Sequence, residues 1–199
     1  MATLWWQYTN PNTLPNLEVW YNAATSTSTT VNNGVITSGT SVTSWHNAGG
    51  LTSHDWNSTG GNRPVFITPA QNNLGVVRFN VPSGTSQNLT INPVTYLQSL
   101  SGATMFILFK TNSTSNGTRY CTSTDVGGFQ WGQNGNQWIG GFSGATFSVD
   151  SITADTNYHH VAIRFDGTAS GNSNRLKVRL DSVDANLTFT GTVNNITSA

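Results

Sequence analysis

Charged residues are scarce in this sequence. Lys, Arg, Asp and Glu together make up 8% of its 199 residues, and the formal net charge at pH 7 is zero. An average globular domain has about 25% charged residues. No cluster of Lys or Arg occurs, so the chain lacks the basic surface on which nucleic-acid binding depends. We therefore predict a protein that does not bind nucleic acid.

Long hydrophobic runs are missing as well. The longest uninterrupted run covers residues 105–109, whereas a helix needs about 20 apolar residues to span a bilayer. We expect no membrane insertion. The first basic residue is Arg63, so the N-terminal residues lack the positively charged start of a signal peptide. We weigh a cytoplasmic protein, a secreted protein whose signal has been removed, and a virion surface component, and we favour the virion.

Cysteine and helix-favouring residues are also rare. The single cysteine, Cys121, cannot form a disulfide within the chain, and we expect it to be a small buried residue. The chain has two lysines and one glutamate, Glu18, while Thr, Asn, Ser and Gly account for 95 of the 199 residues. This composition favours strands and turns over helices.

Short segments in which apolar and polar residues alternate run through the chain. They include residues 17–21, 77–81, 161–165 and 176–180, and this period of two indicates strands with one buried face. The run 105–109 is apolar on both faces, which favours a central strand under a second layer. Asn134-Gly135, between two segments that contain Trp131 and Trp138, predicts a hairpin. The pattern predicts an all-β, two-sheet antiparallel jelly-roll sandwich of about twelve strands with almost no helix.

Several of these segments carry a family's motifs in the family's order. They are LPNLEVWYNAA at 14–24, VTSWHN at 42–47, RPVF at 63–66, GVVRFN at 75–80, TMFILFK at 104–110 and TNYHHVAIRFDG at 156–167. Together they resemble the LamG-like jelly rolls of the concanavalin A-like lectin/glucanase superfamily. The resemblance implies one domain over residues 14–199, preceded by a segment, 1–13, that could contact a partner. It also points to phage particles or secreted bacterial proteins as the setting.

The family's last strand usually returns beside its first, and the matching strand is not found before Ala199. Asn47 and Asn80 also stand where the family has acidic residues, which argues against its calcium site. We expect the segment with Leu17, Val19 and Tyr21 to leave an open sheet edge, which invites another strand. A second copy or another virion protein would pair there and cover Trp5 and Trp6. The alternatives are that residues 188–195 fill the edge, or that the chain is part of a longer one.

Catalytic and metal-binding patterns are weak in this sequence. Retaining glucanases need two carboxylates about 5–5.5 Å apart, and the only glutamate, Glu18, has no acidic residue within thirty positions. We predict a protein that is not an enzyme. His159 and His160 are adjacent in a strand and so face opposite ways, and His46, His54 and Asp55 form at best a partial zinc set. We predict no metal and no cofactor.

The best candidates for a binding site are tryptophans among amide and hydroxyl residues. Sugars stack on aromatic rings while amides and hydroxyls bind their hydroxyl groups. The candidate glycan-binding residues are Trp56, Trp131, Asn134, Asn136 and Trp138. A cross-strand aromatic pair also stabilises a hairpin with no ligand, so both readings stay open. We expect a non-enzymatic virion surface protein that binds host-surface glycans weakly, or alternatively a secreted or cell-surface adhesion module.

Overall fold

The computed structural model describes residues 17–23, 37–49, 54–58, 61–79, 87–90, 99–113, 118–122 and 129–196, with the backbone alone described for residues 118–122. The chain divides into two compact units, Met1–Pro93 and Val94–Ala199. The sheets within these described residues are all antiparallel, and their one α-helix has four residues. None of the described residues forms a helix that is long and apolar enough to cross a membrane. The predicted all-β sandwich with almost no helix is confirmed.

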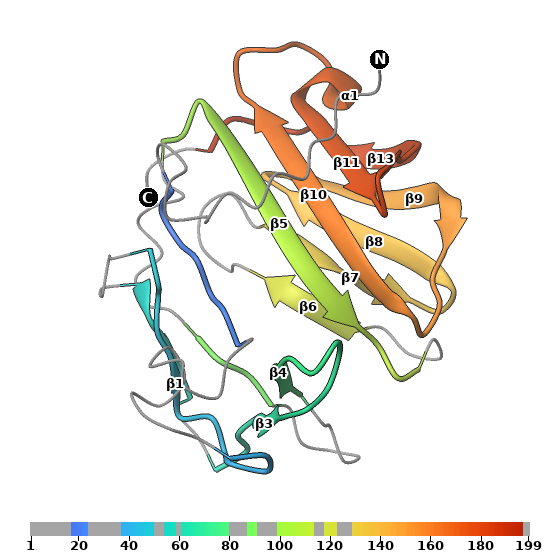
Figure 1. The fold of residues 1–199 in the computed structure, drawn as a ribbon. Helices are drawn as coiled ribbons and strands as arrows, with labels where there is room; N and C mark the ends of the chain where they lie inside the picture. Colours follow the sequence, from blue (N-terminus) through green and yellow to red (C-terminus); the bar gives the residue numbers. More distant parts are fainter. Residues whose placement is uncertain are drawn as a thin grey trace, which may run out of the picture. The chain divides into compact units, whose positions relative to one another are not determined.

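The first unit contains two small sheets, and Figure 1 labels three of their four strands, β1, β3 and β4. β1 (Ser44–Trp45) pairs with β2 (Trp56–Asn57), and β3 (Val65–Ile67) pairs with β4 (Val76–Arg78). Its core is a cluster of Ala23, Val42, Phe66 and Leu89, against which Trp45, Trp56 and Val77 pack. The Trp56 ring lies edge-on to Tyr21, with 5.7 Å between the ring centroids.

The predicted strand over residues 17–21 is not formed. These residues belong to no sheet, although their side chains are partly buried except for that of Glu18. The Asn47 side chain provides the hydrogen bonds that a neighbouring strand would give: Oδ1 accepts from Trp20 N at 2.7 Å, and Nδ2 donates to Glu18 O at 3.0 Å. In this segment the alternating pattern therefore indicates partial burial of the side chains and does not indicate a paired strand. A partner at Leu17, Val19 and Tyr21 stays a prediction, and Trp5 and Trp6 lie outside the described residues.

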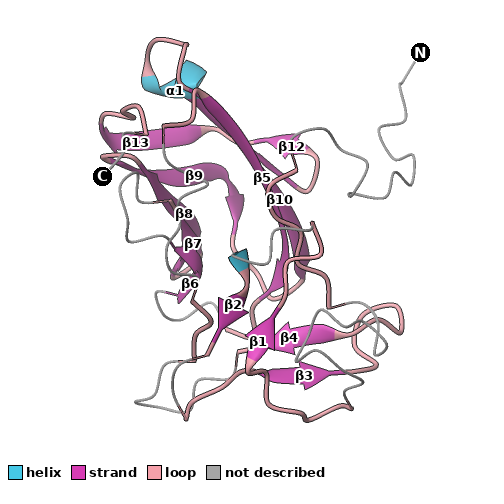
Figure 2. Ribbon diagram, turned by 90° about the vertical axis from the view of Figure 1, so that its left-hand side faces the viewer, coloured by secondary structure: helices cyan, strands magenta, loops and turns pink. Residues whose placement is uncertain are grey.

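The second unit is a sandwich of two sheets (Figure 2). One sheet has the order β12–β11–β10–β5, formed by Val183–Asp184, Leu176–Leu180, Tyr158–Asp166 and Gly102–Lys110. The other has the order β13–β9–β8–β7–β6, formed by Leu187–Gly191, Ala145–Thr153, Gln137–Phe142, Gln130–Asn134 and Thr118–Thr122. The helix α1 (Asn172–Arg175) lies between β10 and β11 in the chain.

A single apolar cluster fills the space between these two sheets. Strands β10 and β11 contribute alternate residues that are almost fully buried, as their alternating sequences predict. Aromatic rings meet across the gap: Phe142 and Phe165 have ring centroids 4.6 Å apart, and Phe109 and Trp138 have centroids 5.3 Å apart. The predicted hairpin is also present, with Asn134 paired to Gln137 and Gly135 at a positive φ of 58° in its turn.

Strand β5 differs from the expectation of a strand covered on both faces. Its Met105 and Ile107 pack toward the core. Phe106 and Leu108, on the opposite face, are each 73% exposed. Among the described strands of this unit β5 pairs with β10 only, so it ends its sheet. Apolar residues on both faces of β5 therefore do not indicate a second covering layer in this unit.

Gly140 in β8 provides a test of the sandwich packing. A Cβ atom at this position would lie 2.2 Å from the Phe147 ring and 2.8 Å from Gln130 O. We predict that Gly140→Ala lowers the free energy of unfolding by about 1–3 kcal/mol, since the overpacked core must shift. Urea denaturation measures this change. Gly102→Ala is the matched control, because its Cβ would meet Phe165 O at an ordinary 3.4 Å; equal losses in both variants would contradict the described packing.

Candidate functional site

The outer face of the five-stranded sheet has an open groove of about 250 Å³. Its lining residues come from four neighbouring strands, β7, β8, β9 and β13, and are Gln130, Ile139, Gly140, Thr146, Phe147, Ser148, Thr188 and Thr190. We call this feature the hydroxyl groove, because four of the lining side chains carry a hydroxyl group.

Alternation along two strands creates this surface. In β9, Phe147 and Val149 point into the core, so Thr146 and Ser148 point outward. In β13, Phe189 packs against the core and leaves Thr188 and Thr190 on the outer face. The burial of the aromatic residues thus fixes the direction of the hydroxyl residues.

The strand register arranges these side chains in two rows. Thr188 is opposite Ser148, which is opposite Ile139 on the next strand. Thr190 is opposite Thr146. Gly141 separates Thr146 from Gln130 in the second row and has no side chain to fill the space between them. The groove therefore combines two hydroxyl pairs with one apolar side chain, Ile139.

Asp150 lies on β9 beside the first row, two residues beyond Ser148, where the register between β8 and β9 shifts. Its Oδ2 accepts a hydrogen bond from Thr188 Oγ1 at 2.5 Å, and its Oδ1 accepts one from Ser148 Oγ at 3.1 Å. Gln137 Nε2 lies 3.5 Å from the same Oδ1. The carboxylate thus fixes the orientation of two groove hydroxyls.

These groups are suited to binding a polyhydroxylated molecule. Threonine, serine and glutamine side chains can each donate and accept hydrogen bonds. Ile139 offers an apolar contact for the C–H face of a sugar ring. A few polar groups around an apolar contact are the usual make-up of a small-molecule site.

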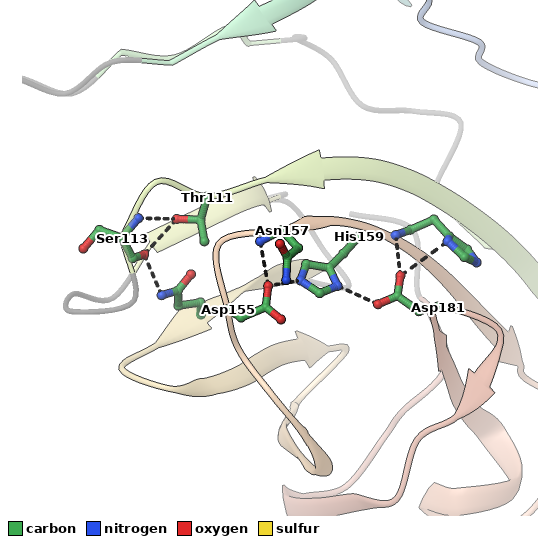
Figure 3. A network of polar contacts seen from close by, with 8 residues as sticks. Thr111, Ser113, Asp155, Asn157, His159 and Asp181 are labelled. Atoms are coloured by element: carbon green, nitrogen blue, oxygen red, sulfur yellow. Dashed lines mark hydrogen bonds and ion pairs between the residues drawn. The ribbon is translucent and has the colours of Figure 1, made fainter. Parts of the chain in front are cut away.

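A second polar cluster is centred on His159 (Figure 3). His159 is 5% exposed, and its ring packs against Trp138 and Phe109 with centroid distances of 5.1 and 5.8 Å. Nδ1 lies 2.6 Å from Asp181 Oδ2, and Nε2 lies 2.9 Å from Asp155 Oδ1. Ionised carboxylates only accept hydrogen bonds, so this arrangement favours the charged imidazolium form of the ring, in which both nitrogens donate.

Opposing effects act on the ionisation of this cluster. Burial, the largest single influence, lowers the pKa of His159, but hydrogen bonds and charge attraction from Asp181 and Asp155 together raise it above its usual value. The Asn157 backbone N–H, followed by the His159 hydrogen bond, lowers the pKa of Asp155. Asp181 also accepts from the His160 backbone N–H at 3.0 Å. The cluster ties the loop before β10 and the turn after β11 to the core.

The structure corrects the proposed role of the two hairpin tryptophans. Trp131 and Trp138 are both 0% exposed and stack on each other in the core, with 6.0 Å between centroids and 16° between planes. A sugar cannot stack on rings that are enclosed by the two sheets, so their role here is packing. Asn134 and Asn136 are exposed at the hairpin turn. Trp56 is half-buried against the core of the first unit.

The partial zinc set in the first unit is held by hydrogen bonds. His46 Nδ1 lies 2.5 Å from Asp55 Oδ2, and its Nε2 lies 3.0 Å from Ser44 Oγ. The other Asp55 oxygen accepts from Asn47 N at 2.8 Å. Both nitrogens of His46 are therefore engaged, and no group of three or more potential metal ligands occurs within the described ranges.

The groove residues were not identified from the sequence. The sequence pattern that could have indicated them is an alternation of hydroxyl residues with inward-facing aromatic residues. The hydroxyl residues are at 146, 148, 188 and 190, and the aromatic residues between them are at 147 and 189. Each segment alone indicates an ordinary half-exposed strand. Only the pairing of β9 with β13 brings the two sets of hydroxyls together.

Comparisons of the chain with protein-family models, with curated proteins and with solved structures each found no match.

The His159 cluster predicts a pH dependence of stability. Because the fold raises the pKa of His159, its contribution is complete below the unfolded-state pKa of about 6.5 and is lost as pH rises through the folded-state pKa. Asp155 has a lowered pKa, so its contribution is lost only in acid, below about pH 4. We expect the free energy of unfolding to fall between about pH 5.5 and about pH 8.5.

Urea denaturation at the two pH values measures this difference. His159→Gln should be less stable than the wild type at the lower pH and should show a smaller difference between the two pH values. Asp166→Asn is the control, because the pKa of Asp166 is lowered, by its hydrogen bonds with Thr168 first, and its carboxylate stays ionised over this range. A pH dependence that persists unchanged in His159→Gln would contradict the assignment.

Proposed function

We propose that this protein is a non-enzymatic carbohydrate-binding module of a virion surface, and that the hydroxyl groove is its glycan site. The observation that carries the proposal is the convergence of four hydroxyl side chains, from β9 and β13, on one groove that also contains Ile139. Neutral hydrogen-bonding groups beside an apolar contact match the alternating hydroxyl and C–H surfaces of a sugar.

The groove suits weak binding at each site. The two buried tryptophans contribute no stacking surface, and Ile139 is the only aliphatic side chain among the lining residues. We expect a Kd on the order of 1 mM for a short oligosaccharide, which corresponds to about 4 kcal/mol of binding free energy. Display of many copies on one particle would convert such weak sites into firm attachment, and this is why we favour a virion over a monomeric lectin.

The opposite face of the sandwich supports attachment to a larger assembly. Phe106 and Leu108 project from β5 and are each 73% exposed. Arg164 on β10 and Arg179 on β11 lie on the same outer face as these two residues, because Ala162 is paired with both Phe106 and Arg179. Adjacent exposed apolar residues with basic neighbours are typical of protein contact surfaces. In this proposal one sheet contacts the particle and the other presents the groove.

The alternative is a secreted or cell-surface adhesion module that uses the same groove. A neighbouring gene for a capsid or tail protein would favour the virion, and a signal peptide upstream in the reading frame would favour secretion. Both forms of the proposal share the glycan site, and they differ in what Phe106 and Leu108 contact.

The first test of the proposal concerns the groove. We predict that Thr188→Val and Ser148→Ala each weaken glycan binding by about threefold to tenfold, since each removes one hydroxyl and its hydrogen bonds. A glycan array followed by titration calorimetry measures the effect. Thr104→Val, an exposed threonine of β5 on the other sheet, is the matched control. Equal binding by the wild type and all three variants would place the glycan site elsewhere. Release of reducing sugar from a glycan would contradict the proposal that the protein is not an enzyme.

The second test concerns the Phe106 and Leu108 surface. We predict that the double variant Phe106→Ser, Leu108→Ser folds normally, because both side chains are already largely in water. We also predict that this variant no longer binds to the particles and is missing from them after purification. Quantitative mass spectrometry of the particles gives the number of copies in each case. Thr188→Val, on the other sheet, should keep the wild-type number. If the double variant is present in the same number of copies per particle as the wild type, the Phe106 and Leu108 surface is not the contact with the particle. If the wild-type chain is missing from purified particles, the virion proposal is wrong.

A further inference from the structure

We propose that Asp150 gives one end of the hydroxyl groove a fixed hydrogen-bond polarity, so that the groove takes neutral and amino sugars and rejects acidic ones. This inference rests on the proposed glycan-binding function of the groove. It assigns a specificity role to a residue that lies beside the lining residues and that contacts two of them.

The polarity follows from the hydrogen bonds of two hydroxyl groups. Thr188 Oγ1 donates its proton to Asp150 Oδ2 at 2.5 Å, and Ser148 Oγ donates its proton to Asp150 Oδ1 at 3.1 Å. A hydroxyl has one proton and two acceptor positions. Both hydroxyls therefore have only acceptor positions left for a ligand, and the carboxylate itself is an acceptor. This end of the groove binds donors.

The charge of Asp150 acts in the same direction. Asp150 is exposed, and within the described part of the chain it forms no ion pair with a Lys, Arg or His side chain. The side chains that donate hydrogen bonds to this carboxylate, the Thr188 and Ser148 hydroxyls and the Gln137 amide, are all uncharged, so its negative charge is not neutralised by them. A uronic acid or sulfate placed at this end brings acceptors and a like charge, whereas a sugar hydroxyl brings a donor. A free amino group brings several donors and the opposite charge.

The other end of the groove has no such polarity. Thr146 and Thr190 face each other across β9 and β13, and a threonine hydroxyl can rotate to donate or accept. This end accepts either polarity, so discrimination against acidic sugars is expected to depend on Asp150 alone.

A printed array that carries neutral, amino, uronic and sulfated glycans tests this inference. The wild-type protein should bind the neutral and free-amino glycans and should show no binding to the uronic and sulfated ones. Asp150→Asn keeps the shape and one acceptor oxygen but removes the charge. We expect Asp150→Asn to bind amino glycans about threefold to tenfold more weakly than the wild type and to bind acidic glycans more tightly by a similar factor. Its affinity for neutral glycans should change little.

Asp184→Asn is the matched control, because the Asp184 side chain is 90% exposed on β12 of the other sheet; it should leave the array pattern unchanged. The inference is overturned if the wild-type protein binds acidic glycans as tightly as neutral ones, or if Asp150→Asn gives the same array pattern as the wild type. Either result leaves the proposed function intact. An array on which the wild-type protein binds no glycan overturns the proposed function and this inference with it. A circular-dichroism spectrum and melting temperature like those of the wild type establish that Asp150→Asn is folded.

Discussion

The layer of aromatic rings between the two sheets is the constraint on which the second unit depends. Trp131, Trp138 and Phe147 turn inward from three adjacent strands and are almost fully buried. Because side chains alternate along a strand, each inward ring places its neighbours on the outer face. The hydroxyl groove is therefore a consequence of the core: Thr146 and Ser148 face water because Phe147, between them, does not.

His159 connects this core to the loops at one end of the sandwich. Its ring packs on Trp138 while its two nitrogens bind carboxylates on two different loops. A buried charge is tolerated only when it is paired and hydrogen-bonded, and the two aspartates meet this need. Asp181, which lies in the β11–β12 turn with a positive φ of 49°, serves His159 through one oxygen and His160 through the other. The cluster thus gives the two adjacent histidines a structural role.

The sequence predicted the all-β class, the strands β10 and β11 and the hairpin at residues 134–135, because each depends on local alternation or turn chemistry. The segment 17–21 has the same alternation, yet Asn47 pairs with its backbone and no strand forms. Trp131 and Trp138 were open to two readings, since a tryptophan among polar residues can lie on either side of a strand. The structure decides for the core. The groove could not be found in this way, because it requires the pairing of β9 with β13, which are more than thirty residues apart.

The central claim is that the outer face of the five-stranded sheet binds a sugar. Mapping of backbone amide chemical shifts by NMR, during titration with a neutral oligosaccharide, tests it most directly. The account predicts that the shifted amides gather in β8, β9 and β13 around Ile139, Ser148 and Thr188, while the amides of β11 on the other sheet stay unchanged. Shifts that gather around Phe106 and Leu108, or at the Asn134 turn with none in β9 and β13, would contradict it.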